Sequence, residues 1–122
     1  MRWATAVRST SFVQRGSATV LALGIVAALV CLTTGAIAIA GACVAKQRAA
    51  GAADLAALAA ADVASGTIPG TPCVEAERVA RANGASLGSC EVDGAVARVT
   101  ASLSYLGFGV DIEARAGPPG SR

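Results

Sequence analysis

The feature that most constrains this chain is a run of 30 residues, from Gly16 to Ala45, without a charged side chain. Of these residues, 22 are hydrophobic. A bilayer core about 30 Å thick requires roughly 20 apolar residues at helical rise. The threonines in the run can return their hydroxyls to the helix backbone. The sequence therefore predicts a transmembrane helix over residues 16–45, in preference to a buried helix of a soluble fold.

A basic arm followed by an apolar run is also typical of a secretory signal peptide. Small residues suited to cleavage lie at Ala36–Ala38 and at Ala40–Ala42. The apolar part of a signal peptide, however, spans only about 7–15 residues. Cys43 also gives a weak lipoprotein box, in which Ala40 stands where leucine is usual. Retention in the membrane is favoured, and release by signal peptidase is the alternative.

The charges that flank the run indicate its orientation. Residues 1–15 carry three arginines and no acid, whereas the other flank carries Lys46 and Arg48, followed by two aspartates. The positive-inside rule predicts a basic cytoplasmic arm over 1–15 and an extracytoplasmic C-terminal part. The chain is thus expected to be a single-pass protein of the cell membrane. From Lys46 onward there are seven basic and eight acidic residues, which offers no basic surface for nucleic acid.

Residue types that support catalysis or metal binding are scarce. The chain has no histidine, which removes the commonest general base and a common zinc ligand. Its serines lack a base, and its one lysine, Lys46, adjoins the predicted membrane edge. Four acids could meet and bind calcium weakly, although a solvated strand face is the favoured interpretation. These acids are Glu91, Asp93, Asp111 and Glu113. We therefore expect no catalytic residue, no metal site, no cofactor and no enzyme.

The four cysteines divide into two pairs. Cys31 and Cys43 lie in the apolar run, where they are expected to behave as small hydrophobic residues. Cys73 and Cys90 lie 17 residues apart in the polar part. Because an exported domain meets an oxidising compartment, we predict a disulfide between Cys73 and Cys90 rather than two unrelated thiols.

Alanine dominates the segment after the run. Because alanine has the best helix propensity, residues 46–66 are predicted to form an Ala-rich helical extension of the membrane helix. Apolar residues at spacings of three and four form a stripe along this helix, which ends at Val63. The stripe covers either the domain's own core or a partner helix, and small pairs in the membrane helix permit close approach of a neighbour. The predicted helix-packing residues are Gly24, Ala28, Ala38, Ala42, Ala52, Leu55, Leu58 and Ala59.

Residues 71–116 are predicted to form a small disulfide-linked α+β domain. Pro72 begins a short helix, and Gly84 ends it. Three strands follow as an antiparallel meander with one buried face, joined first by an Asp93-Gly94 turn. On the last strand the predicted buried residues are Phe108, Val110, Ile112, Ala114 and Ala116. Residues 117–122 are expected to form a disordered tail. The core is rich in alanine, so a disulfide or neighbouring subunits must stabilise it.

Two segments resemble the TadE/TadG-like proteins of the tight-adherence (Flp) pilus machinery. Gln14–Ala18 resembles the start of that family's membrane helix, and Gln47–Ala61 resembles its signature after the helix. The downstream spacing is similar to that of the short actinobacterial branch found beside secretion-ATPase genes. The residues concerned are Cys73, Ala82–Ala85, Cys90 and Val92–Gly94.

The resemblance implies a pilin-like α+β fold and a non-enzymatic minor pilin or assembly component anchored in the membrane. Its implied partners are membrane lipid, pilin or pilin-like subunits and the inner-membrane pilus or secretion platform. Prepilin peptidase substrates usually carry glutamate at the fifth position after the processed glycine. Counted from Gly16, that position is Leu21, so the resemblance does not extend to this processing. The alternative function is a secreted, disulfide-stabilised binding module released by signal peptidase.

Overall fold

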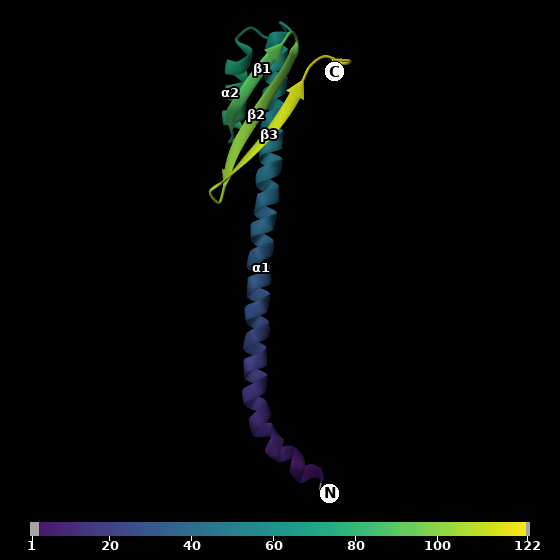
Figure 1. The fold of residues 1–122 in the computed structure, drawn as a ribbon, viewed down its shortest axis with the longest axis vertical. Coiled ribbons are helices and arrows are strands. Elements are labelled where there is room, and N and C mark those ends of the chain that lie inside the picture. Colours follow the sequence, from purple (N-terminus) through teal and green to yellow (C-terminus); the bar gives the residue numbers. More distant parts are fainter. Residues whose placement is uncertain (1–2, 122) are drawn as a thin grey trace. The chain divides into compact units, whose positions relative to one another are not determined.

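The computed structural model describes residues 3–121, with side chains described from Gly16 onward. Its elements, in order, are α1 (Trp3–Ala64), α2 (Pro72–Ala82), β1 (Ser86–Asp93), β2 (Val96–Tyr105) and β3 (Phe108–Ala116) (Figure 1). The predicted α+β class, with one long apolar helix, a short helix and a three-stranded antiparallel sheet, is confirmed. The chain divides into two compact units, residues 1–40 and 41–122, and α1 contributes to both.

In the first unit, α1 exposes its apolar side chains. Every residue from 16 to 40 is exposed. The hydroxyl of Thr33 donates to the carbonyl oxygen of Leu29 at 2.9 Å, and Thr34 makes the equivalent bond one residue later. These bonds satisfy the threonine hydroxyls within the helix, as predicted. The predicted basic arm, residues 1–15, lies outside the residues whose side chains are described.

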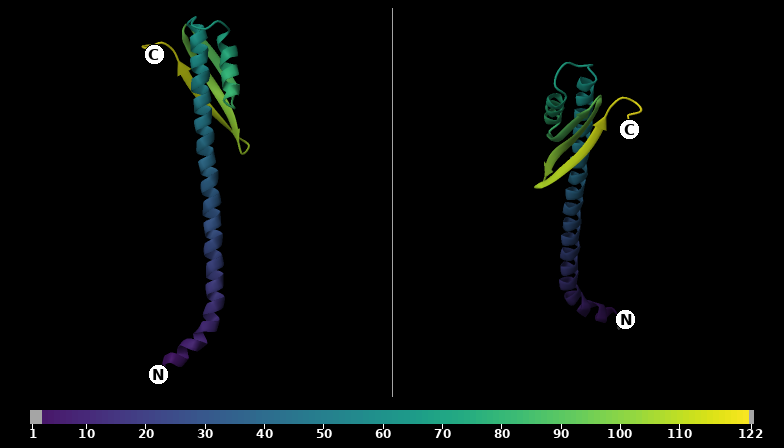
Figure 2. Two further views of the ribbon diagram at one scale, coloured as in Figure 1. Left: turned by 180° about the vertical axis from the view of Figure 1, so that it is seen from behind. Right: turned by 45° about the horizontal axis from the view of Figure 1, so that its top comes forward.

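In the second unit, the later part of α1 and the whole of α2 pack with a sheet of strand order β1-β2-β3 (Figure 2). Both strand pairs are antiparallel, and α2 lies beside β1. The buried residues of β2 alternate along one face and join the alanines of α1 in a single core. Among the residues that the structure describes, every buried hydrophobic residue is alanine except Val63 and Val99. The core is therefore as thin as the composition predicts.

The short helix α2 begins and ends where the sequence predicts. Pro72 is its first residue, and Gly84 follows it with φ of +76°. The amide of Ala85 donates to the carbonyl oxygen of Ala80 at 3.0 Å, and the amide of Gly84 donates to that of Arg81 at 3.0 Å. This pair of bonds is a Schellman motif, which requires a left-handed residue after the helix. The turn brings the chain directly into β1.

The first hairpin turn lies one residue later than predicted. Asp93 pairs with Val96, so the two turn residues are Gly94 and Ala95. Of these two, only Gly94 has a positive φ, at +62°. A type II′ turn needs a left-handed residue, normally glycine, at its first central position, and this register places Gly94 there. β1, which this turn follows, begins at Ser86.

Burial along the second hairpin decreases towards its turn. Val99 is fully buried and Leu103 is half-buried, whereas Phe108 is 75% exposed. The prediction that Phe108 lies on the buried face is therefore wrong. Tyr105, its cross-strand partner, already lies over Gly41, the first residue of this unit. Phe108 thus lies at the limit of the cover that the unit's own helix provides.

Candidate functional site

In the second unit, α1 buries its alanines and exposes its leucines. The buried alanines, which pack on the sheet and α2, are Ala49, Ala52, Ala53, Ala56, Ala57 and Ala60. Leu55 is 47% exposed and Leu58 is 53% exposed. The predicted stripe is divided between the two alternatives: Ala52 belongs to the core, Leu55 and Leu58 are exposed, and Ala59 is half-buried. The helix-packing role of these residues stays a prediction. The methyl side chains of the buried alanines let the helix backbone pack near the sheet, and a larger side chain at these positions would need space that a packed interior does not offer.

The exposed apolar residues form a surface that we call the outer face, made of Val44, Gly51, Leu55 and Leu58. Their spacings of seven, four and three place them on one side of an α-helix. A Cβ added at Gly51 would meet nothing within 4 Å. The outer face thus offers exposed large side chains around an open position. An exposed apolar strip of this kind is typical of a surface that another helix or protein covers.

The helix of the first unit is a candidate membrane span. The segment Gly16–Ala64 includes a stretch long and apolar enough to cross a bilayer, and no part of its most apolar window is buried. A Cβ added at Gly24 would meet nothing within 4 Å, and Ala28 and Ala42 are exposed. The helix-packing role of these residues, and of Ala38, stays a prediction.

The predicted disulfide between Cys73 and Cys90 is present. It joins α2 to β1, with the two Cα atoms 5.8 Å apart, within the usual range for a disulfide. Cys31 and Cys43 are free and exposed. The bridge closes the segment that contains α2 and so ties the short helix to the edge of the sheet.

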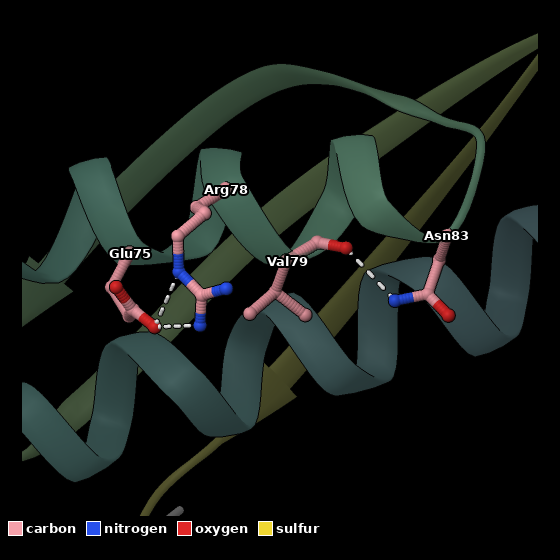
Figure 3. A network of polar contacts seen from close by, with 4 residues as sticks. All are labelled: Glu75, Arg78, Val79 and Asn83. Carbon is pink, nitrogen blue, oxygen red and sulfur yellow. Dashed lines mark hydrogen bonds and ion pairs between the residues drawn. The ribbon is translucent and has the colours of Figure 1, made fainter.

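The charged side chains of α2 form ion pairs with one another, and Figure 3 shows the pair of Glu75 and Arg78. Arg78 binds Glu75 through two donors, and Arg81 binds Glu77 at 2.6 Å. The hydrogen bonds from Arg78 lower the pKa of the Glu75 carboxyl, and Glu75 in turn raises the pKa of Arg78. The side-chain amide of Asn83 caps the helix end by donating to a carbonyl oxygen at 2.8 Å. The two carboxylates are held apart by separate arginines, which does not suit acid–base chemistry.

The four acids considered for calcium do not gather. Arg98 lies opposite Glu91 on β1 and forms an ion pair with Glu113 on β3 at 3.1 Å. Asp111 lies opposite Ser102. Within the described part of the chain, no three His, Cys, Asp or Glu side chains lie close enough to hold a metal ion. The acids belong to a polar strand face in which Arg98 separates them.

Comparison with protein families supplies the decisive observation for α1. Residues 16–63 match the family model described as "Putative Flp pilus-assembly TadE/G-like". This segment is therefore similar to TadE/TadG-like proteins. The matched range contains both the apolar run and most of the alanine-rich helix, where the sequence resemblance was strongest. No curated protein and no solved structure matches the chain. The TadE/TadG-like match ends within α1, so the assignment of the later residues to an actinobacterial branch stays a prediction.

Proposed function

We propose that this chain is a non-enzymatic, membrane-anchored minor pilin-like or assembly component of a tight-adherence (Flp, type IV-like) pilus or secretion system. The TadE/TadG-like match over residues 16–63 carries the proposal, because it supports involvement in Flp pilus assembly. The match covers the candidate span and the helix that bears the outer face, which are the two parts an anchored subunit would use.

Membrane anchoring is supported by how α1 displays its apolar side chains in the first unit. Large residues such as Val20, Leu23 and Ile37 are more than half exposed, and full exposure of such a helix to water would be costly. Lipid removes that cost. The three arginines of residues 1–15 support an orientation with the N-terminus in the cytoplasm and the disulfide-linked domain outside.

The outer face supports a subunit contact. Leu55 and Leu58 lie one and two turns after the open position at Gly51, and the small residues of the membrane helix would let a neighbouring helix approach in the same way. We therefore assign pilin or pilin-like subunits, or the inner-membrane platform, as the partners of this face, together with lipid along the span.

Site-specific photocrosslinking from Leu58 in living cells tests this contact. We expect a crosslink to an Flp-type pilin or to a platform protein. Glu113 is a matched control, because its side chain is exposed on β3 and distant in sequence from the outer face. A protein that crosslinks to nothing at Leu58, remains monomeric and behaves identically after deletion of the pilus genes would contradict the proposed function.

The alternative, a secreted binding module, requires cleavage near Gly41 or Cys43. The core residues that α1 contributes begin at Ala45, so such cleavage would leave the domain's core intact. The intact mass of the exported protein therefore separates the two functions. A mature chain that starts near Gly41 or Cys43 supports release, whereas a chain that retains the apolar run supports anchoring.

A further inference from the structure

The β2–β3 turn is the most apolar exposed point of the second unit. Leu106 is 71% exposed and Phe108 is 75% exposed, more than any other large hydrophobic residue described in that unit. No charged residue occurs from Val99 to Val110. The β1–β2 turn at the other end of the sheet differs, because Glu91 and Asp93 adjoin it. The two ends of the sheet therefore suit different surroundings.

The turn holds a leucine in a backbone conformation that leucine rarely adopts. Leu106 has φ of +48° and Gly107 has φ of +81°, so both central residues are left-handed, as in a type I′ turn. Asparagine or glycine is usual at the first of these positions, whereas a residue with a Cβ incurs a cost of about 1–2 kcal/mol. Leu106 is exposed, so burial in its own domain does not offset this cost. Strained residues of this kind are typical of contact sites.

The turn lies at the end of the second unit where α1 enters it (Figure 1). A shallow groove is lined by Val44, Ala45 and Arg48 on α1 and by the last residues of β2. Tyr105 covers Gly41 so closely that a Cβ there would overlap its ring. At the other end, Ala95 lies beside Leu58 and Ser65. β2 therefore runs antiparallel to α1, and its last residue, Tyr105, brings the turn to the Gly41 end of the unit.

Gly41 lies just after the central part of the apolar run. The 20 central residues of the run from 16 to 45 are 21–40, and about 20 residues at helical rise span the roughly 30 Å hydrocarbon core. Gly41 is then at the boundary between hydrocarbon and headgroups, where tyrosine is enriched. Lys46 and Arg48 follow at headgroup level, where they can meet lipid phosphates.

We propose that the β2–β3 turn inserts Leu106 and Phe108 into the outer leaflet of the membrane that α1 crosses. Tyr105 lies at headgroup level, and the uncharged strand ends leave no charge to be desolvated. Lipid is the occupant because Tyr105, next to the turn, lies against Gly41 near the end of the apolar run, and because the turn carries no charge for a polar partner. The turn is thus a second membrane contact, which holds the domain against the bilayer surface. This proposal rests on the membrane anchoring given under the proposed function.

Tryptophan quenching in vesicles tests the insertion with the full-length protein. Trp3 is the only tryptophan, so Trp3→Phe provides a background for Phe108→Trp. The protein is reconstituted in phosphatidylcholine–phosphatidylglycerol vesicles whose acyl chains carry bromine close to the headgroup. We expect blue-shifted emission and quenching several-fold stronger than for Val92→Trp, a partly exposed position near the β1–β2 turn. Leu106→Asp in the Phe108→Trp background should abolish most of this quenching.

A third probe separates this proposal from the anchoring on which it rests. Val30→Trp lies near the middle of the apolar run and should be quenched by bromine placed deep in the acyl chains. If Val30→Trp is not quenched, the anchoring fails and the insertion fails with it. If Val30→Trp is quenched but Phe108→Trp is no more quenched than Val92→Trp, the insertion alone is overturned. Blue-shifted Phe108→Trp without bromine quenching would show a protein partner at the turn and would also overturn it.

Discussion

Before Gly41, α1 carries valines, leucines and isoleucines whose side chains are exposed, whereas after Gly41 the same helix buries alanines and turns its leucines outward. Both regions are apolar, but they match different surroundings. In the proposed membrane anchoring, lipid accepts side chains of any size, so this segment can carry the large apolar residues that favour insertion most. Where α1 packs on the sheet, its buried residues are alanines, and a packed interior has no space for larger ones there. Hydrophobicity alone therefore does not identify the buried face.

Charging the middle of the span should produce the largest effect. Val26→Arg combined with Val30→Arg places two charges on one side of the helix, at a cost of about 5–7 kcal/mol for insertion. We expect the protein to lose its membrane retention, measured by extraction of membranes at alkaline pH. The matched pair Leu55→Arg and Leu58→Arg, on the outer face, should leave retention unchanged. Equal loss for both pairs would remove the distinction between the two regions.

Breaking the disulfide should have the next largest effect, and only on the second unit. Cys73→Ser with Cys90→Ser removes a bridge of 17-residue separation, worth about 3 kcal/mol in the chain-entropy model. Thermal unfolding in detergent should shift markedly downward. Cys31→Ser with Cys43→Ser is the control and should leave the melting temperature unchanged. Free thiols at Cys73 and Cys90 in the unreduced exported protein would contradict the bridge.

Exchanging residue size within α1 should give a smaller but directional effect. Ala56→Leu adds volume at a fully buried position, which typically destabilises a packed core by about 1–3 kcal/mol. Leu58→Ala, two residues later on the outer face, should change the free energy of unfolding of the isolated protein very little. Denaturant titration of both variants in detergent measures the difference. A Leu58→Ala variant that is the less stable of the two would reverse the assignment of the faces.

The smallest effect concerns the ion pair on α2. Because Arg78 lowers the pKa of Glu75 below its ordinary value of 4.5, the folded state binds this proton less readily than the unfolded state. The pair therefore stabilises the domain above the unfolded pKa, and that contribution is lost as the pH falls through the folded pKa. Glu75→Gln should abolish this part of the acid dependence of the melting temperature. The difference in melting temperature between the original protein and Glu75→Gln should vanish at low pH. A difference that grows as the pH falls would contradict the stabilising role of the ion pair.

Local signals in the sequence were sufficient for the element types. Pro72 and Gly84 bound α2 because proline lacks an amide donor and glycine accepts a positive φ. Alternation predicted a meander with one buried face, and the buried residues of β2 are Ala97, Val99 and Ala101. The hairpin register was missed by one residue because both Asp93-Gly94 and Gly94-Ala95 are acceptable turns, and cross-strand pairing along the whole strand selects between them.

The candidate surfaces were predicted less completely. The spacing of three and four grouped Ala52, which is buried, with Leu55 and Leu58, which are exposed. It left open whether the stripe covers the core or a partner helix, because period takes no account of the space between helix and sheet. The exposure of Phe108 was missed for a related reason: alternation continues to the strand end, whereas cover by a second layer does not.

The sequence by itself determined the apolar run, the pairing of Cys73 with Cys90, the α+β class and the TadE/TadG-like resemblance, since each depends on neighbouring residues or on residue type. Only the tertiary structure decided which side of α1 faces the sheet, which turn residues are left-handed and where β2 meets the helix. These depend on the distance between packed layers, and that distance is set by residues far apart in the chain. The uncharged run from Gly16 to Ala45 is thus defined in the sequence, but the contact of Tyr105 with Gly41, near the end of that run, forms only in the folded domain.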